Sequence, residues 1–353
     1  MVPALEQVLS GQSTTAPPPG SFSNGGGFVG SSTTAGSVGS NGGLDGEPRK
    51  KSSLAATVRS LAGVALPGGA KTDKGEDKPH KKKIAHELSS ITFLAGVKFK
   101  GFEMAKQCGV NEMSAFGEPK TEKILKKCPE EWVEYNKRQM SRIYPAGSRI
   151  DSSNYDPVPN WNVGSQIVAL NYQTSGSAMR INDGKFRDNG GCGYLLKPPA
   201  LRLPDMKFHP ETGPFPPGKM TLTVQVISAR QLPKPGGAQK GEIIDPYVML
   251  QMHGVPADCK KGKSTKRVND NGFNPVWNET SIFEVVMPDL ALLVLTVMDK
   301  DVDSDDFVAH AVIPISTLRQ GYRSVRVYSK NGTTHGDFQY ASLLCHFSMK
   351  IEV

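Results

Sequence analysis

The composition of the first 83 residues limits what this chain can fold into more than any other feature. Gly, Ser, Thr and Pro dominate the segment, as in "TTAPPPGSFSNGGGF", and Phe22 and Phe28 are its only aromatic residues. Such a segment cannot bury enough apolar surface to offset the chain entropy that folding removes. We therefore predict a disordered, low-complexity segment over residues 1–83 and expect the packed structure in the rest of the 353 residues.

Charge, cysteine content and apolar runs limit the class of protein further. No stretch approaches the ~20 apolar residues of a membrane-spanning helix, and "MVPALEQVLSG" lacks the basic start of a secretory signal. The five cysteines are an odd number without a CxxC pair, which favours reduced thiols in the cytosol. The net charge of +8 includes an excess of Lys and Arg over residues 48–150, which suits phosphate-bearing partners, either nucleic acid or an anionic membrane.

Residues 84–202 read as alternating strands and helices. "ITFLAGVKF", "SRIYP" and "SQIVALNYQ" are strand candidates, and the last is apolar on both faces. "KTEKILKKCPEEWVEYNKRQ" has helical spacing, with Pro129 placed to open a second helix. A doubly buried strand that alternates with helices indicates a parallel sheet covered by helices. About four strands fit in this region, too few to close a parallel barrel.

Residues 220–353 have an all-β pattern. "TLTVQVIS" alternates apolar and polar residues, "LLVLTVMD" and "HFSMKIEV" repeat the strand signal, and Gly, Pro and Asn separate the runs. Regular short strands of this kind predict an antiparallel sandwich. A Pro-rich connector over residues 203–219 joins the two regions.

Aspartates gather at the loops of this sandwich. Asp245 ends "KGEIIDPYV", Asp270 lies in "VNDNGFNPVW", and Asp299 and Asp301 begin the acidic run "DKDVDSDD". Calcium takes six to eight oxygen ligands, and three loops at one end of a sandwich can surround such an ion. The alternative is a set of solvated turn aspartates, since Asp favours turns.

The all-β region resembles the C2 domain of phosphoinositide-specific phospholipases C through "DPYVMLQMHG", "NDNGFNPVWNETSIFEVVMPDLALLVLTVMDKD" and "DDFVAHAVIPISTLRQGYRSVRVYSKNG". The resemblance implies calcium-dependent binding to an anionic membrane surface. One departure is Gln239, where many C2 domains have a further acid, so we expect modest calcium affinity. The ligand positions implied by the family are Ile243 (through its carbonyl), Asp245, Asp270, Asp299 and Asp301, with Lys300 between the last two.

"ELSSITFLAGVKFKGFE", "MSRIYPAGSRIDSSNYDPVPNWNVGSQIVALNYQT" and "FRDNGGCGYLLKPPALR" are similar to the Y-box half of the same lipases' catalytic domain, a distorted TIM barrel. The resemblance implies that Arg142 binds the 4-phosphate of the phosphoinositide substrate and that Tyr144 packs against the sugar. The family's phosphate-contacting serine precedes the Phe of "EMSAF", where this chain has Ala115. Ser114 lies one place earlier, and a shift of one residue turns a strand side chain to the other face.

Other features of this region have plainer interpretations. Without the resemblance, Arg142 would be a surface ion-pair residue. "DNGGCGY" lacks the GxxxxGK[ST] pattern of a phosphate-binding loop and is followed by prolines, so we predict a tight turn. We interpret Arg149 and Lys98 as surface charges.

The fold class predicted is an α/β half of a TIM-like barrel followed by an all-β C2 sandwich, with a disordered N-terminal segment. In the family, the two catalytic histidines belong to an X half, and none of the seven histidines here lies in X-like sequence. We therefore expect no catalytic residue in this chain, an inactive chain in isolation, and a missing X half supplied by the full-length protein or by another chain.

Two functions remain open at this stage, and a third is disfavoured. The first is the C-terminal part of a calcium-dependent phospholipase C that hydrolyses phosphatidylinositol 4,5-bisphosphate at the cytoplasmic, inner face of the plasma membrane. The second is a non-catalytic, calcium-dependent membrane adaptor centred on the C2 domain. Nucleic-acid binding is disfavoured because no aromatic stacking platform accompanies the basic residues.

Overall fold

The computed structural model describes residues 84–235, 243–301 and 304–352. The predicted disorder over residues 1–83 and the position of Gln239 lie outside the described residues. No described helix has the length and apolar character needed to span a bilayer.

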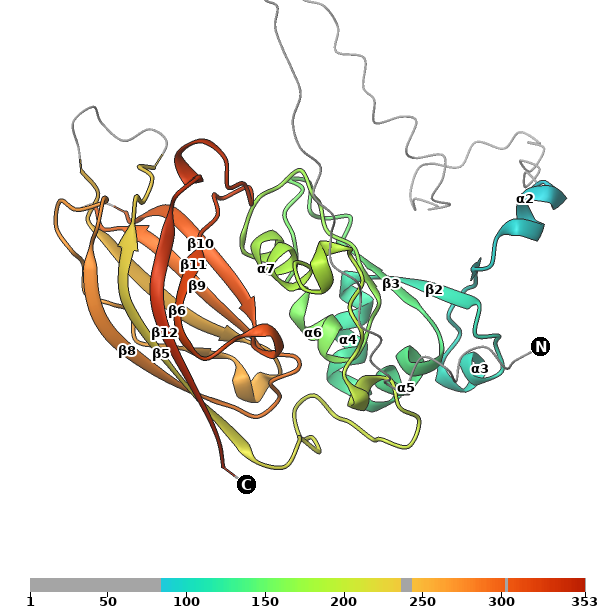
Figure 1. Ribbon diagram of the computed structural model, residues 1–353. Coiled ribbons are helices and arrows are strands. Elements are labelled where there is room, and N and C mark those ends of the chain that lie inside the picture. The colour runs from blue at the N-terminus through green and yellow to red at the C-terminus, as the bar shows by residue number, and fades with distance from the viewer. Residues whose placement is uncertain (1–83, 236–242, 302–303, 353) are drawn as a thin grey trace, which may run out of the picture. The chain divides into compact units, whose positions relative to one another are not determined.

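A four-stranded parallel sheet with strand order β1-β2-β3-β4 organises the first region. This arrangement confirms the expected part of a TIM-like barrel, and helices connect its strands (Figure 1). The elements of this region are α2 (His86–Ile91), β1 (Ala95–Gly96), α3 (Phe102–Lys106), β2 (Glu112–Gly117), α4 (Glu118–Lys127), α5 (Pro129–Arg138), β3 (Ser141–Tyr144), α6 (Val158–Asn162), β4 (Ile167–Val168) and α7 (Ser177–Lys185).

Local sequence explains the helix ends. Pro129 opens α5 as predicted, where its missing N–H leaves no helical hydrogen bond unmade. Glu130 and Glu131 occupy the first turn, and Lys137 and Arg138 the last, so both ends complement the helix dipole. The "DNGGCGY" segment forms a tight turn, as predicted, with one turn of 3₁₀ helix over Asn189–Gly191 and positive φ at its three glycines.

One face of the parallel sheet packs against helices, and no helix among the described residues covers the other. On the covered face Phe116 and Ile143 are fully buried with Trp132 of α5, whose ring lies 4.5 Å from that of Phe116. The residues of β3 alternate between buried and exposed. The expected double burial of "SQIVALNYQ" is wrong: only Ile167 and Val168 are strand, and both are partly exposed because β4 is an edge strand of a sheet with one open face.

The second region is an antiparallel sandwich, as predicted, built from the sheets β10-β9-β6-β7 and β11-β12-β5-β8 (Figure 1). Leu222, Val224 and Val226 of β5 point into its core and are fully buried. The strands are β5 (Lys219–Arg230), β6 (Pro246–His253), β7 (Lys260–Lys261), β8 (Val276–Val285), β9 (Leu292–Asp299), β10 (Asp306–Pro314), β11 (Gly321–Arg326) and β12 (Ser342–Glu352).

The two regions share apolar contacts. Leu292 and Val294 lie on the face of β9 opposite the sandwich core and pack with Trp161 and Ile181 of the first region. Gly184 of α7 meets Val312 of β10 so closely that a Cβ on the glycine would lie 2.2 Å from the Cβ of Val312. β9 is therefore buried on both faces, one against its own domain and one against its neighbour.

Candidate functional site

Arg142 and Tyr144 lie together on the open face of β3. Both side chains are exposed, and the guanidinium carbon of Arg142 is 5.5 Å from the centre of the Tyr144 ring. Arg142 forms no ion pair with any other residue that the structure describes, in contrast to the surface ion-pair alternative. The pair presents a permanently charged fork beside an aromatic ring, a combination suited to a phosphorylated sugar.

Ser114 lies on the opposite face of the sheet. Its residue is 3% exposed, and its hydroxyl donates a hydrogen bond to the Val97 carbonyl at 3.0 Å. The neighbour of Arg142 across the parallel ladder is Ala115, which is exposed like Arg142. The structure therefore brings Arg142 and Tyr144 together but does not bring Ser114 to them.

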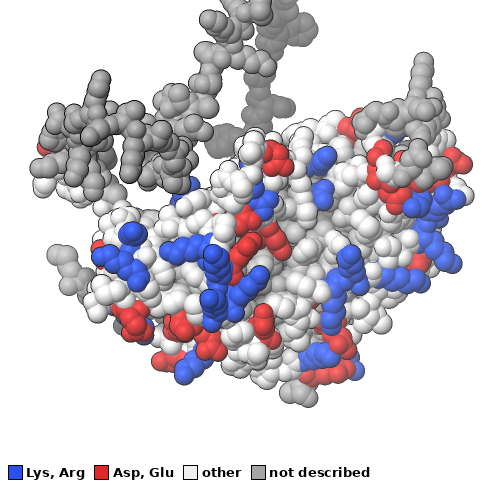
Figure 2. All heavy atoms as spheres, turned by 180° about the vertical axis from the view of Figure 1, so that it is seen from behind, with Lys and Arg blue, Asp and Glu red and all other residues white. Residues whose placement is uncertain are grey.

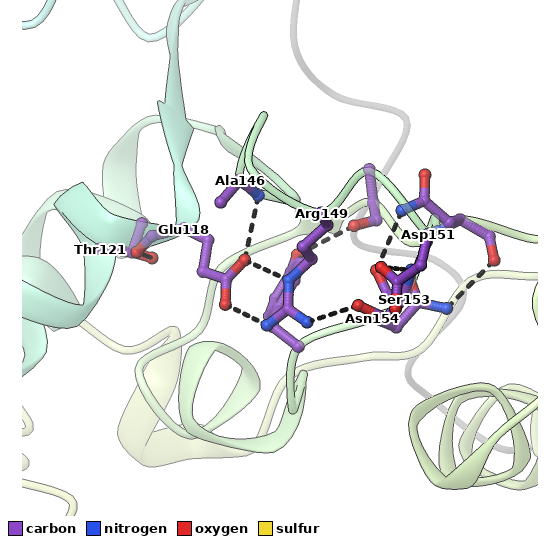
Figure 3. Close-up of polar contacts among 10 residues, drawn as sticks. Glu118, Thr121, Ala146, Arg149, Asp151, Ser153 and Asn154 are labelled. Atoms are coloured by element: carbon purple, nitrogen blue, oxygen red, sulfur yellow. Dashed lines mark hydrogen bonds and ion pairs between the residues drawn. The ribbon is translucent and has the colours of Figure 1, made fainter.

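A buried carboxylate joins the start of α4, which directly follows β2, to the loop that follows β3 (Figure 3). Glu118, the first residue of α4, is 7% exposed. Its Oε2 accepts hydrogen bonds from the Ala146 amide at 3.0 Å and from Arg149 Nε at 2.7 Å, while Oε1 accepts one from a terminal nitrogen of Arg149. The hydrogen bond from Arg149 lowers the pKa of Glu118 despite its burial, so the carboxylate stays charged.

Sequence reasoning missed this pair: Arg149, interpreted as a surface charge, is partly exposed but pairs with a buried acid. Its side chain is 26% exposed and also donates to Ser153 Oγ at 3.0 Å. The network then continues to the loop after β4, because the Asn171 amide donates to Asn154 Oδ1 at 2.6 Å. The start of α4 and the loops after β3 and β4 are thus joined at the carboxyl edge of the sheet. This is the edge where parallel barrels bind ligands.

Three aspartates of the sandwich are joined by hydrogen bonds from backbone amides to side-chain carboxylates. The Asp245 amide donates to Asp299 Oδ1 at 2.7 Å, and the Asp270 amide donates to Asp245 Oδ1 at 2.8 Å. Asp299 is 4% exposed, whereas Ile243 is 54% exposed. Hard carboxylate oxygens from three loops suit calcium chemically.

The carboxylates also have cationic neighbours within the protein. Arg267 lies 3.7 Å from Asp245, and Lys300 pairs with Asp305 at 2.9 Å, which also accepts a hydrogen bond from the Tyr247 hydroxyl at 2.6 Å. Within residues 84–235, 243–301 and 304–352, no three His, Cys, Asp or Glu side chains are arranged to hold a metal ion. The predicted residues thus share one end of the sandwich and supply suitable donors, but as arranged they do not form a metal cage.

Surface charge is mixed. On the face shown in Figure 2, Lys and Arg side chains lie beside Asp and Glu side chains. Several of the cations in the described parts of the chain are paired, as Lys219 is with Glu284 at 2.6 Å and Lys263 with Glu279 at 3.5 Å. Arg142 differs from these two lysines: its guanidinium lies against the Tyr144 ring, and it forms no ion pair with an acid in the described parts of the chain.

Comparisons with known proteins agree with this architecture. A model for the Y domain of phosphatidylinositol-specific phospholipase C matches residues 88–200, and a C2 domain model matches residues 220–329. The 1-phosphatidylinositol 4,5-bisphosphate phosphodiesterase delta-4 of Pongo abelii is 45% identical over 69% of this chain and 32% of that protein. The human inactive phospholipase C-like protein 1 is 39% identical over 76% of this chain and 24% of that protein.

A solved structure, that of PLC21 from S. officinalis, matches with a TM-score of 0.68 at 36% identity, over 77% of this chain and 34% of the other. The chain spans about a third of the length of the curated relatives it matches. The domain matches and the fold together show that this chain belongs to the phosphoinositide-specific phospholipase C family, with a Y domain followed by a C2 domain.

Proposed function

We propose that this chain forms the substrate-reading and membrane-binding part of a phospholipase C that hydrolyses phosphatidylinositol 4,5-bisphosphate. The observation that supports it most is the position of Arg142 and Tyr144 on the open face, at the carboxyl edge of the parallel sheet. The forked guanidinium of Arg142 would bind the 4-phosphate, and the ring of Tyr144 would pack against the inositol.

The groups that transfer protons would come from another part of the full-length protein or from a separate chain. Within residues 84–202, all of which the structure describes, His86 is the one histidine, and it is exposed on α2. General acid-base catalysis of phosphodiester cleavage needs a positioned acid and a positioned base. We therefore expect the Y domain to bind and orient the headgroup, and an X half to carry out the proton transfers.

Headgroup binding tests the role of Arg142. We expect the full 353-residue chain to bind inositol 1,4-bisphosphate more tightly than inositol 1-phosphate in NMR titrations, because only the first carries a 4-phosphate. Arg142→Ala should remove this preference. Lys126→Ala, which removes the same charge from an exposed site on α4, should retain it. Equal binding of the two headgroups by the unmodified chain would refute the assignment.

For the C2 domain we propose calcium-dependent binding to anionic membranes, with the protein located peripherally at the cytoplasmic face of the plasma membrane. Asp245, Asp270, Asp299, Asp301 and the Ile243 carbonyl would hold calcium, with Lys300 between the last two aspartates. The supporting observation is that Asp245 is hydrogen-bonded both to Asp299, at the end of β9, and to Asp270. Bound calcium would replace the local negative charge by a positive one and so attract lipid phosphates.

Vesicle binding tests this second role. We expect cosedimentation with phosphatidylserine vesicles to require calcium and to fall in the double variant Asp299→Asn, Asp301→Asn. Asp289→Asn, an exposed site beyond the other end of β9, is the matched control. Calcium-dependent binding that the double variant leaves unchanged would exclude these residues as ligands.

The alternative function is a non-catalytic membrane adaptor, and the match to a relative named inactive phospholipase C-like protein 1 favours it. The two functions differ in what precedes the Y domain in the full-length protein. An X half with its two histidines, read from the complete transcript, would support the enzyme. Hydrolysis by the purified chain alone would contradict both proposals.

A further inference from the structure

The Glu118 carboxylate requires an explanation, because the proposed headgroup contacts do not use it. Burying a charged carboxylate is costly unless several hydrogen bonds replace its water. Here both oxygens are occupied, by the Ala146 amide and by two nitrogens of Arg149. This bidentate geometry is the strongest form of such a pair and is available to Arg but not to Lys.

The Glu118–Arg149 pair holds two backbone segments that flank Tyr144. Gly117 precedes Glu118, and a Cβ on Gly117 would lie 3.4 Å from the Tyr144 ring, so this ring rests against the end of β2. Ala146, whose amide Glu118 accepts, follows Tyr144 by two residues. The backbone on which the ring rests and the backbone that carries the ring are therefore fixed by one side chain.

The pair also limits where Arg142 can reach. The cation–π contact joins Arg142 to the Tyr144 ring, so a displacement of that ring changes the surroundings of the guanidinium. The third contact of Arg149, to Ser153, extends the constraint along the loop after β3 (Figure 3). Neither Glu118 nor Arg149 presents a free charge to a ligand on the open face.

We propose that Glu118 and Arg149 are positioning residues for recognition of the phosphorylated inositol ring. They act through Tyr144 and Arg142 and do not contact the ligand. This inference rests on the proposed function of Arg142. Because the pair sets the direction of the Arg142 fork toward one phosphate, its loss should weaken discrimination for the 4-phosphate more than binding in general.

The test compares Glu118→Gln, Arg149→Lys and Arg142→Ala in the full chain. Glu118→Gln keeps the shape and removes the charge, whereas Arg149→Lys keeps the charge and removes the fork. Glu103→Gln, in the exposed Glu103–Lys106 pair of α3, is the matched control. The measurements are NMR titrations with inositol 1,4-bisphosphate and inositol 1-phosphate, the Arg142 Nε–H signal, hydrogen exchange of the Ala146 amide, and thermal unfolding.

We expect both pair variants to bind inositol 1,4-bisphosphate about tenfold more weakly, the scale of one lost charge-assisted hydrogen bond. Binding of inositol 1-phosphate and the behaviour of Glu103→Gln should stay unchanged, while the Ala146 amide exchanges faster. A lower melting temperature with intact discrimination between the two headgroups would overturn the positioning role and leave a structural one. Failure of the unmodified chain to discriminate would refute the Arg142 assignment, and the positioning role with it.

Discussion

The two sheets of the C2 sandwich bury their facing surfaces against each other, whereas the Y-domain sheet covers one face and leaves the other open. In the sandwich, alternate residues of β5 and β12 meet the opposite sheet, and Phe347 and Leu222 are almost fully buried. In the Y domain, the alternation of β3 buries Ile143 under helices and exposes Arg142 and Tyr144. The exposed face thus carries Arg142 and Tyr144, which we propose to contact the headgroup, and it lacks the cover that the facing sheets give each other in the sandwich.

Strand length follows the same division. The sandwich includes strands such as β5, Lys219–Arg230, and β12, Ser342–Glu352, which pair along almost their whole length. In the Y domain β1 and β4 contain two residues each. A parallel sheet with such short edge strands and one uncovered face has few hydrogen bonds and little buried surface to oppose chain entropy.

The largest effect is expected on the folding of the two domains when each is expressed alone. Expressed alone, residues 219–353 should unfold in one cooperative transition, whereas residues 84–218 should show none, because half of a barrel core has no cover. Thermal unfolding followed by near-ultraviolet circular dichroism measures both, with residues 84–353 as the control. A sharp transition for residues 84–218 would show that the open face does not weaken the Y domain.

Substitutions at two neighbouring positions of β3 compare the covered and the exposed face of the Y-domain sheet. Ile143→Ala should lower the free energy of unfolding by about 2–5 kcal/mol, the usual cost of truncating a buried aliphatic residue. Tyr144→Ala, on the exposed face, should cost less than about 1 kcal/mol. Urea denaturation of residues 84–353 gives both values, and similar costs would mean that both faces of β3 are covered in solution.

The alternation of apolar and polar residues predicted which strand side chains are buried, but it does not show what covers a strand that is apolar on both faces. The two-residue period of strands predicts that Ser114 and Ala115 point to opposite faces, and the structure has Ser114 buried and Ala115 exposed beside Arg142. β9 reads as one continuous apolar run, "LLVLTVMD", and the cover over its second face comes from Trp161 and Ile181 of the other domain. No local pattern specifies that partner.

An ion pair between residues far apart in the sequence could not be predicted either. Glu118 and Arg149 are 31 positions apart, and each alone is a common surface residue. Their partnership depends on the parallel register of β2 and β3, which brings the ends of both strands to one edge. Glu118 directly follows β2, but Arg149 comes five residues after the end of β3, so no local pattern in the sequence links the two residues.

The contact between the domains gives the next prediction. In Gly184→Ala the new methyl group would overlap Val312, so the free energy of unfolding should fall by about 1–3 kcal/mol, as in other overpacked sites. Gly176→Ala, in open space at the start of the same helix, is the control. Adding Val312→Ala to Gly184→Ala should restore part of the loss. No recovery in the double variant would mean that the overlap is not the cause.

The contact between the domains should also make stability depend on pH. His310 of β10 is fully buried, neither ring nitrogen has a hydrogen-bond partner among the residues described, and Arg180 and Arg187 of the Y domain lie nearby. Burial, with a smaller contribution from the two arginines, lowers the pKa of His310 from 6.5 to about 3. The unfolded chain therefore binds a proton that the folded chain does not, over the interval between these values.

The lowered pKa of His310 does not reduce the free energy of unfolding above pH 6.5, but it reduces it increasingly as the pH falls from 6.5 toward 3. The slope of this decrease approaches about 1.4 kcal/mol per pH unit within that interval. His310→Leu should flatten the urea-derived stability profile between pH 6.5 and pH 4, while His335→Leu, at an exposed site, should not. If His310→Leu retained the full slope, protonation of other groups would govern the acid sensitivity of the contact, and the Y domain and C2 domain would not be coupled through this histidine.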